Sequence, residues 1–196
     1  MTSLSLRERH PVELVDQTGR PVGVRTVGEA HQAPGRLHRA FSVVLTDGFG
    51  RILLQRRSAG KTRFASLWAN ACCGHPSPEQ SVTDAANQRI HEELGLGPVA
   101  FADAGVYLYY AEDPITGRVE FEYDHVLVGR VPADVSLAPD PNEVAELSWL
   151  TRRQLKNSLG ASPESYAPWL AGVIARLARH ESNPDPAKPA GPSGGR

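Results

Sequence analysis

The chain has 196 residues, a formal net charge of −1 and 22% charged residues. This length predicts one domain with a sizeable core, at residues 1–181. The near-neutral charge argues against a uniform nucleic-acid-binding surface, although it allows a local basic pocket. No apolar run approaches the roughly 18 residues that span a membrane, and the first ten residues lack a signal-peptide core. We therefore expect no nucleic-acid partner and no membrane partner.

The two cysteines, Cys72 and Cys73, are adjacent in the chain. A vicinal pair is poorly shaped for an ordinary structural disulfide, so both thiols are predicted to be free. Free thiols are typical of the reducing cytoplasm, which we predict as the location of the protein.

Short runs rich in apolar residues predict strands in the first part of the chain, at 12–15, 21–26, 40–45 and 51–55. The last two strands are joined by the glycine-containing loop 46–50, which predicts a hairpin. Basic residues follow this hairpin, up to Arg63.

The second part of the chain mixes helices and strands. Apolar residues recur every four positions along 78–94, which predicts a helix that ends at Gly95. Further strands are predicted at 107–110, 119–131 and 146–150, and further helices at 152–158 and 165–180. Residues 182–196 are almost all Pro, Gly, Ala, Asp, Ser and Lys, which predicts a disordered tail. The pattern as a whole indicates an α+β fold.

Residues with metal-binding and acid–base chemistry lie in three segments. Cys73 precedes His75 by two positions, in a tight Gly-Pro setting. Glu120 and Glu122 are spaced i and i+2 on a predicted strand, so both carboxylates point to one face. Two more histidines, His31 and His38, lie upstream. Together these groups could build a hard-cation site beside a reactive sulfur, which favours an enzyme.

Residues 74–96 follow the layout of a Nudix box, and its ending is intact at 92–96. The earlier part is degraded, because Gln80 stands where the box has its first glutamate and Gln88-Arg89 stand where it has Arg-Glu. Loss of metal-binding glutamates argues against hydrolysis, while Arg89 and Glu93 keep an i,i+4 pair. The fold is still predicted to be a Nudix-type α/β/α sandwich with a mixed sheet.

The chain closely resembles type I isopentenyl-diphosphate Δ-isomerase, a metal-dependent member of the Nudix superfold, from about residue 12 to residue 169. The matching segments occur in one order: 30–31, 36–42, 54–57, Lys61, 68–70, 73–76, 93–95, 120–122 and 168–169. The resemblance implies interconversion of isopentenyl diphosphate and dimethylallyl diphosphate in isoprenoid biosynthesis, through a tertiary carbocation. It also implies a small-molecule partner only, and we expect a monomer or weak dimer.

The resemblance implies two metal sites. Five residues would bind one divalent ion, Mn²⁺, Zn²⁺ or Mg²⁺: His31, His38, His75, Glu120 and Glu122. Mixed nitrogen and oxygen donors at near-octahedral geometry suit these ions. Glu93, with the backbone oxygen of Cys73, would hold a second ion, Mg²⁺, that bridges to the diphosphate.

The resemblance also assigns the reacting groups. Cys73 and Glu122 would act on opposite faces of the alkene, with Tyr109 assisting proton delivery near Glu122. Trp169 would face the cation, which an indole ring stabilises by about 2 kcal/mol or more when it is desolvated. Cys72 is interpreted as a small buried residue without a role in the reaction.

Arg57, Lys61 and Arg89 match positions that contact the diphosphate, and their charges suit phosphate. One position departs from the family pattern, because Val27 stands where a basic residue is expected. Either Arg25 substitutes for it, or the diphosphate site has one charge fewer.

Two other functions remain open at the level of sequence. A Nudix diphosphohydrolase would release phosphate from nucleoside diphosphates, but the degraded box argues against it. A non-catalytic metal- or phosphate-binding module on the same scaffold would need no thiol, so the presence of both Cys73 and Glu122 argues against that.

Overall fold

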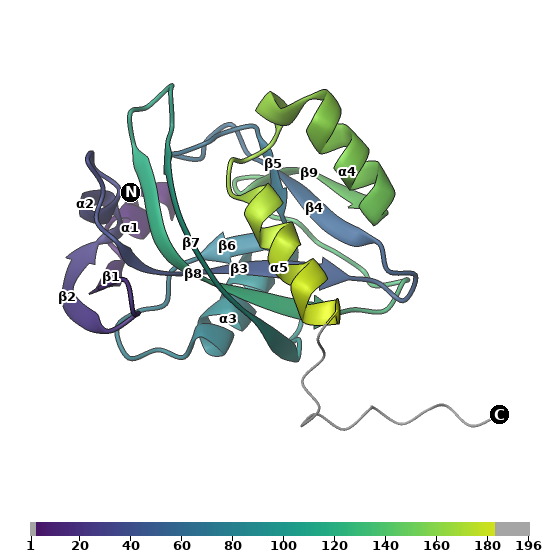
Figure 1. The fold of residues 1–196 in the computed structure, drawn as a ribbon, viewed down its shortest axis with the longest axis horizontal. Coiled ribbons are helices and arrows are strands. Elements are labelled where there is room, and N and C mark those ends of the chain that lie inside the picture. The colour runs from purple at the N-terminus through teal and green to yellow at the C-terminus, as the bar shows by residue number, and fades with distance from the viewer. Residues whose placement is uncertain (1–2, 183–196) are drawn as a thin grey trace.

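The structure is a computed structural model that describes residues 3–182. Its first half contains α1 (Ser3–Glu8), β1 (Pro11–Val15), β2 (Pro21–Thr26), α2 (Val27–Ala30), β3 (His38–Thr46), β4 (Ile52–Arg57), β5 (Trp68–Asn70) and β6 (Cys72–Gly74). Its second half contains α3 (Val82–Leu94), β7 (Phe101–Glu112), β8 (Val119–Arg130), β9 (Val144–Leu150), α4 (Arg152–Ala161), the 3₁₀ turn η1 (Pro163–Ser165) and α5 (Leu170–Ser182). Figure 1 shows their arrangement. No helix within residues 3–182 is long and apolar enough to cross a membrane.

Strand β3 organises the mixed sheet, because it pairs in parallel with β8 and antiparallel with β6. In these registers His38 lies beside Glu122, and Ser42 lies beside Cys73. Segments that are far apart in sequence are thereby brought to one region of the sheet.

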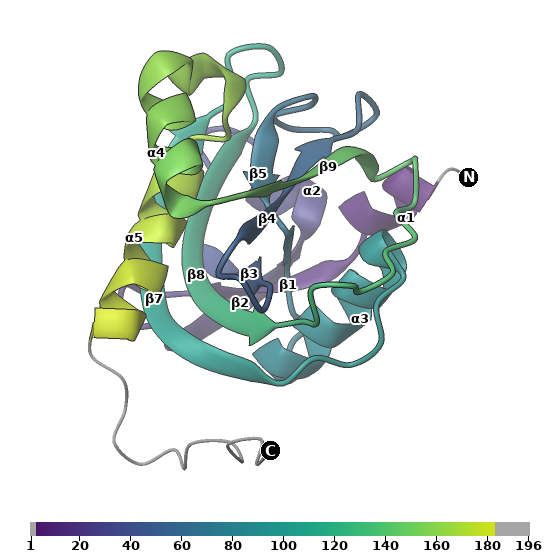
Figure 2. The same cartoon turned by 90° about the vertical axis from the view of Figure 1, so that its right-hand side faces the viewer.

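The two faces of the sheet are covered by different helices. On β3, Phe41, Val43 and Leu45 pack into a buried cluster that includes Ile90 and Leu94 of α3. Val44 points to the opposite face and joins a cluster with three residues of α5: Leu170, Val173 and Leu177. Figure 2 shows α3 on one side of the sheet and α4 and α5 on the other. The predicted α/β/α sandwich of the α+β class is confirmed.

Helix α3 is confirmed, but it begins at Val82 rather than at residue 78. The Ser81 side chain accepts a hydrogen bond from the Asp84 backbone N–H at 3.0 Å, which caps the first turn. Gly95 ends the helix with a left-handed backbone, at φ 67°. Residues 78–81 therefore belong to the preceding loop.

The predicted helix at 165–180 begins too early. Pro168 lacks an amide hydrogen, and the Ala167 N–H donates to the Trp68 carbonyl at 2.8 Å instead of to a helical carbonyl. Helix α5 therefore starts at Leu170 and ends at Ser182. The sequence also predicts a disordered tail at 182–196. Ser182 belongs to α5, and residues 183–196 lie outside the described part of the chain.

Residues 40–45 and 51–55 form strands that are joined by a turn, but the predicted hairpin pairing does not extend along them. Only Thr46 and Ile52 pair across it, because β4 turns away and pairs with β5 and β9. The short elements α1, α2, β5 and β6 were not predicted, since each is too short to show a periodic pattern.

Helix α5 meets strand β7 closely at Gly172, where an added Cβ would lie 2.1 Å from Tyr107 Cζ. Tyr107 stacks on Tyr109 at 5.3 Å between ring centroids, so its ring has little freedom to move aside. We predict that Gly172→Ala destabilises the fold by about 1–3 kcal/mol through overpacking. Gly160→Ala is the control, because no atom lies within 4 Å of a Cβ there, and it should stabilise α4 by up to about 1 kcal/mol. Equal unfolding free energies of the two variants in urea would contradict this packing.

Candidate active site

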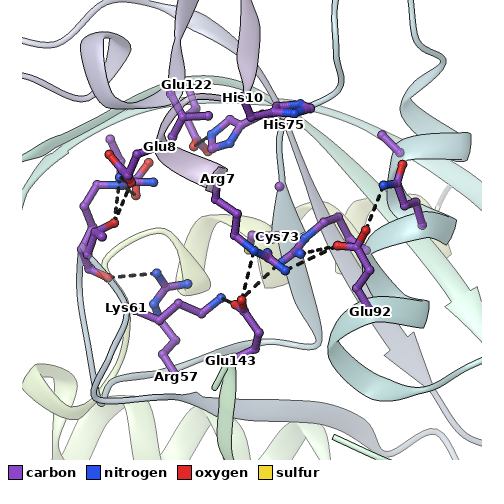
Figure 3. Close-up of a pocket in the computed structure, with 18 of the residues that line it drawn as sticks. Arg7, Glu8, His10, Arg57, Lys61, Cys73, His75, Glu92, Glu122 and Glu143 are labelled. Carbon is purple, nitrogen blue, oxygen red and sulfur yellow. Dashed lines mark hydrogen bonds and ion pairs between the residues drawn. The ribbon is translucent and has the colours of Figure 1, made fainter. Parts of the chain in front are cut away.

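One cavity of about 570 Å³ opens beside β6 and β8, under α1. This volume suits a small-molecule ligand. Figure 3 shows charged side chains from several elements converging on it. Of the residues predicted for the site, these line the cavity: Arg57, Lys61, Cys73, His75, Arg89, Tyr109, Glu120, Glu122 and Trp169.

Four side chains form a compact cluster on the cavity wall. The potential ligand atoms of His31, His38, His75 and Glu122 all lie within 4.8 Å of one another. His75 Nε2 is 3.0 Å from Glu122 Oε1, and the His31 and His38 ring centroids are 4.5 Å apart. The structure thus brings together the C-cap residue of α2, the first residue of β3, the residue after β6 and a residue of β8, and this cluster could hold a divalent metal ion.

Local backbone contacts aim two histidine rings into the cluster. His31 Nδ1 is 2.7 Å from the carbonyl of Val27, the first residue of α2, and His38 Nδ1 is 2.7 Å from the Arg36 carbonyl. Each contact leaves Nε2 directed inward. His38 Nε2 is buried and has no hydrogen-bond partner within residues 3–182. A buried imidazole nitrogen without a partner fits the role of a metal ligand.

Burial and charge set different protonation states in this cluster. Burial lowers the pKa of His38 well below its ordinary value and also lowers that of His75. Burial opposes protonation of His31 too, but the neighbouring Glu120 carboxylate raises its pKa to about 9. Burial would raise the pKa of Glu122, yet hydrogen bonds from His31 and His75 hold it well below the usual range. The cluster therefore combines an ionised carboxylate, Glu122, with two neutral imidazoles, His38 and His75, and a protonated His31.

Glu120 lies at the edge of the cluster and has a partner that the sequence did not reveal. Its Oε2 is 2.8 Å from His31 Nε2, while Arg63 Nε donates to its Oε1 at 3.0 Å. Arg63 is itself buried and also donates to Glu8 of α1 at 2.8 Å. In the sequence, Arg63 is simply the last of the basic residues that follow the strand at 51–55.

The two adjacent cysteines pack in different clusters. Cys72 is fully buried in the cluster that contains α3, whereas Cys73 packs against the cluster that contains α5. Asn70 Nδ2 donates to Cys73 Sγ at 3.2 Å, and Ser42 Oγ lies 3.6 Å from the same sulfur. Burial, followed by the charge of Asp124, raises the pKa of Cys73 to about 12. The thiol therefore carries its proton at neutral pH.

Tyr109 and Trp169 lie on the same wall as the carboxylate. Tyr109 donates its hydroxyl to Glu122 Oε2 at 2.7 Å, and burial raises its pKa well above the ordinary value. The Trp169 ring lies 6.0 Å from the Tyr109 ring and 5.5 Å from the Arg57 guanidinium. Its indole N–H donates to Asn70 Oδ1 at 3.1 Å, which fixes the orientation of the ring.

The opposite part of the cavity holds two buried carboxylates surrounded by cations. Glu93 pairs with Arg89 and accepts hydrogen bonds from Lys61 Nζ at 3.2 Å and Gln55 Nε2 at 3.1 Å. Burial would raise the pKa of Glu93, but the charges of Lys61 and Arg89 lower it to about 2. Glu143, which the sequence analysis missed, also pairs with Lys61. Nothing in its loop sequence distinguished it from a surface glutamate.

Arg25 lies outside the cavity. Its side chain is exposed on β2 and donates to the neighbouring Val24 carbonyl at 2.8 Å, outside the cavity lining. Val27 lines the cavity without a charge. Arg25 therefore does not supply the charge that Val27 lacks.

The fold and the site define this chain as a Nudix-type domain. The NUDIX domain family matches residues 36–176. A Deinococcus radiodurans protein of known structure shares the fold with a TM-score of 0.67 at 20% identity, over 85% of this chain and 98% of that one. A MutT protein from Methanosarcina mazei Go1 shares it with a TM-score of 0.56 at 18% identity, over 75% and 96%.

Sequence relatives narrow the class further. A Nocardia farcinica protein named isopentenyl-diphosphate Delta-isomerase is 54% identical over 174 residues, which cover 88% of this chain and 98% of that protein. A protein of the same name from Streptomyces griseus subsp. griseus is 45% identical over 83% of this chain and 81% of its own length. Within the NUDIX family, the chain belongs to the isopentenyl-diphosphate Delta-isomerases.

The pKa of Glu93 gives a prediction about acid stability. Because its folded-state pKa of about 2 lies below the ordinary 4.5, ionised Glu93 stabilises the fold above pH 4.5. This contribution is lost as the pH falls through the folded pKa, and roughly 2 kcal/mol should be gone by pH 3. Urea unfolding of wild type and Glu93→Gln should show the stability gap narrowing from pH 6 to pH 3. A gap that stays constant over this range would contradict the ion pairing, and the half-exposed Glu92→Gln serves as the control.

Proposed function

We propose that this chain interconverts isopentenyl diphosphate and dimethylallyl diphosphate in the cavity, with Cys73 and Glu122 as the proton-transferring groups. The isomerase function is confirmed by family membership. The observation that supports the assignment of the groups is that a protonated thiol and an ionised carboxylate line the same cavity, beside a cluster suited to a metal ion.

The reaction moves a double bond without net oxidation or reduction. One proton is added to the terminal alkene carbon, which leaves a tertiary cation, and one proton is then lost from the carbon on the diphosphate side. Such a step needs one proton donor and one acceptor, and a pocket that keeps water from trapping the cation. Trp169 faces this pocket, and its indole ring would stabilise the cation.

The protonation states of the cavity supply both kinds of group. Cys73 and Tyr109 carry their protons, because burial raises the pKa of each. Glu122 is ionised and accepts the Tyr109 hydrogen bond. In one turnover the donor loses a proton to the substrate and the acceptor gains one. The starting state is restored when the acceptor releases its proton to solvent and the donor takes one up.

A divalent ion fits the cluster of His31, His38, His75 and Glu122, with Glu120 as a further ligand. Its donor set of imidazoles and carboxylates suits Mn²⁺, Zn²⁺ or Mg²⁺. When bound, the ion would supply positive charge that neutralises the buried carboxylates. Glu93 and the Cys73 carbonyl would hold a second ion, Mg²⁺, against the diphosphate. Arg57, Lys61 and Arg89 would bind the phosphate oxygens directly.

The direct test is to incubate the protein with isopentenyl diphosphate and either Mg²⁺ or Mn²⁺, and to look for the acid-labile allylic product. Release of phosphate from nucleoside diphosphates, without allylic product, would instead support a Nudix diphosphohydrolase.

The adjacent cysteines allow a matched test of the reacting thiol. Cys73→Ala should lower kcat by roughly 10²–10⁴-fold, the usual contribution of a general acid or base. Cys72→Ala should keep most activity, because that side chain is packed in the core on the α3 side. Circular dichroism and metal content should match wild type in Cys73→Ala. Wild-type turnover in Cys73→Ala would rule out the proposed role, and an equal loss in Cys72→Ala would mean that the other sulfur reacts.

The two carboxylates of β8 should differ in their effects. Glu122→Gln should lower both metal content and activity, because the residue both belongs to the cluster and exchanges a proton. Glu120→Gln should chiefly lower metal affinity. Elemental analysis of both variants, combined with turnover at saturating metal, separates the two roles. If neither variant loses metal, these side chains do not serve as ligands.

A further inference from the structure

Arg7 reaches into the cavity from α1 and contacts its acidic part (Figure 3). Its Nε lies 3.1 Å from Glu143 Oε1, and its Nη1 lies 3.8 Å from Glu93 Oε1. Its Nη2 donates to Glu92 Oε2 at 3.4 Å. Its side chain is 30% exposed, so it lies at the cavity mouth rather than in free solvent.

The neighbouring Glu8 fixes α1 in this position. Thr62 Oγ1 donates to Glu8 Oε1 at 2.9 Å, Arg63 donates to the same oxygen at 2.8 Å, and Arg118 donates to Oε2 at 2.8 Å. Three partners from two other segments hold the end of this helix. Because Glu8 is the next residue, these contacts also fix the position of Arg7.

The hydrogen-bonding capacity of Arg7 is largely unused. A guanidinium has five N–H donors, and within residues 3–182 Arg7 makes one hydrogen bond, to Glu92. Glu143 Oε1 is buried beside it and accepts no hydrogen bond from the described residues. Arg57, by contrast, directs its Nε and Nη2 to the carbonyls of Phe64 and Arg63, at 3.0 and 2.9 Å.

Several cations surround the buried carboxylates on this side of the cavity. The buried carboxylates Glu93 and Glu143 are matched by two cations, Lys61 and Arg89. Arg7 adds a further positive charge beside them, on the side of the cavity where Val27 supplies none.

We propose that Arg7 is a substrate-binding residue that donates to the diphosphate oxygens of isopentenyl diphosphate, beside Lys61 and Arg89. This inference rests on the proposed function of the site. Its planar fork suits two oxygens of a diphosphate. The Nη2 contact with half-exposed Glu92 costs little to give up, while Nε can stay beside buried Glu143. Arg7 thus supplies the charge that Val27 lacks and that Arg25, outside the cavity, does not provide.

The test compares Arg7→Ala with Arg7→Lys, and uses Arg9→Ala as the control. Arg9 is exposed, follows α1 and lies outside the cavity lining. Arg7→Ala should raise KM for isopentenyl diphosphate and Ki for inorganic pyrophosphate on the order of tenfold, because a charge-assisted phosphate contact is lost. Arg7→Lys should recover part of both effects, and Arg9→Ala should change neither. The effect of Arg7→Ala should shrink as salt concentration rises.

Two outcomes would overturn the proposal. An unchanged Ki for pyrophosphate in Arg7→Ala, with a wild-type melting temperature, would show that Arg7 does not bind the anion. A lower KM together with tighter Mg²⁺ binding in Arg7→Ala would show that the guanidinium blocks a cation site instead. Failure of the proposed function is distinguishable, because wild type would then make no allylic product while pyrophosphate binding still reports on Arg7.

Discussion

The burial of carboxylates around one cavity is the constraint on which this structure depends. Glu93, Glu120, Glu122 and Glu143 are each 6% exposed or less. An ionised carboxylate is costly to bury unless a cation or several hydrogen-bond donors accompany it. Each of these groups accordingly has a positive or hydrogen-bonding partner from a distant part of the chain. The site is therefore assembled by charge pairing across elements as much as by the packing of the core.

The same burial determines which groups carry protons. A thiol and a phenol in a desolvated cavity keep their protons, whereas a carboxylate that accepts several hydrogen bonds remains ionised. Cys73 and Glu122 lie on strands that flank β3 on its two sides, so one sheet positions both. Burial and hydrogen bonding in the fold thus set which of these groups carry a proton.

Much of this could be predicted from local sequence. The apolar stripe of α3 and the i,i+2 carboxylates of β8 are periodic signals, and both appear in the structure with small shifts at their ends. The histidines and Cys73 were found through motifs that recur in order along the chain. The start of α5 was misplaced although Pro168 carried the information, because a proline inside an expected helix indicates a boundary.

The remaining features depend on contacts between residues far apart in sequence, which leave no periodic trace. Arg63 can be buried because it donates hydrogen bonds to Glu8 and Glu120, which are 55 and 57 residues away in the chain. Glu143 sits in a loop whose sequence resembles any surface turn, yet it is 1% exposed. Helix α1 spans six residues, which is too short for a helical repeat to identify. Such ion pairs can be identified only from the three-dimensional structure, because the sheet brings their partners together from distant parts of the chain.

The residues that could hold a metal ion lie outside the altered Nudix helix. Gln80 stands where the box pattern would place its first glutamate, and Gln88 stands where it would place an arginine. Gln80 Nε2 donates to Gln88 Oε1 at 3.3 Å, and Gln88 Nε2 donates to Glu92 Oε1 at 2.8 Å. These amides bring no negative charge of their own. The one buried carboxylate left on the helix, Glu93, is already matched by Lys61 and Arg89. The cluster that could hold an ion instead combines Glu122 of β8 with three histidines, at the end of α2, on β3 and just after β6. It adjoins Tyr109, which donates to Glu122, and in the proposed function the carbon chain reacts there.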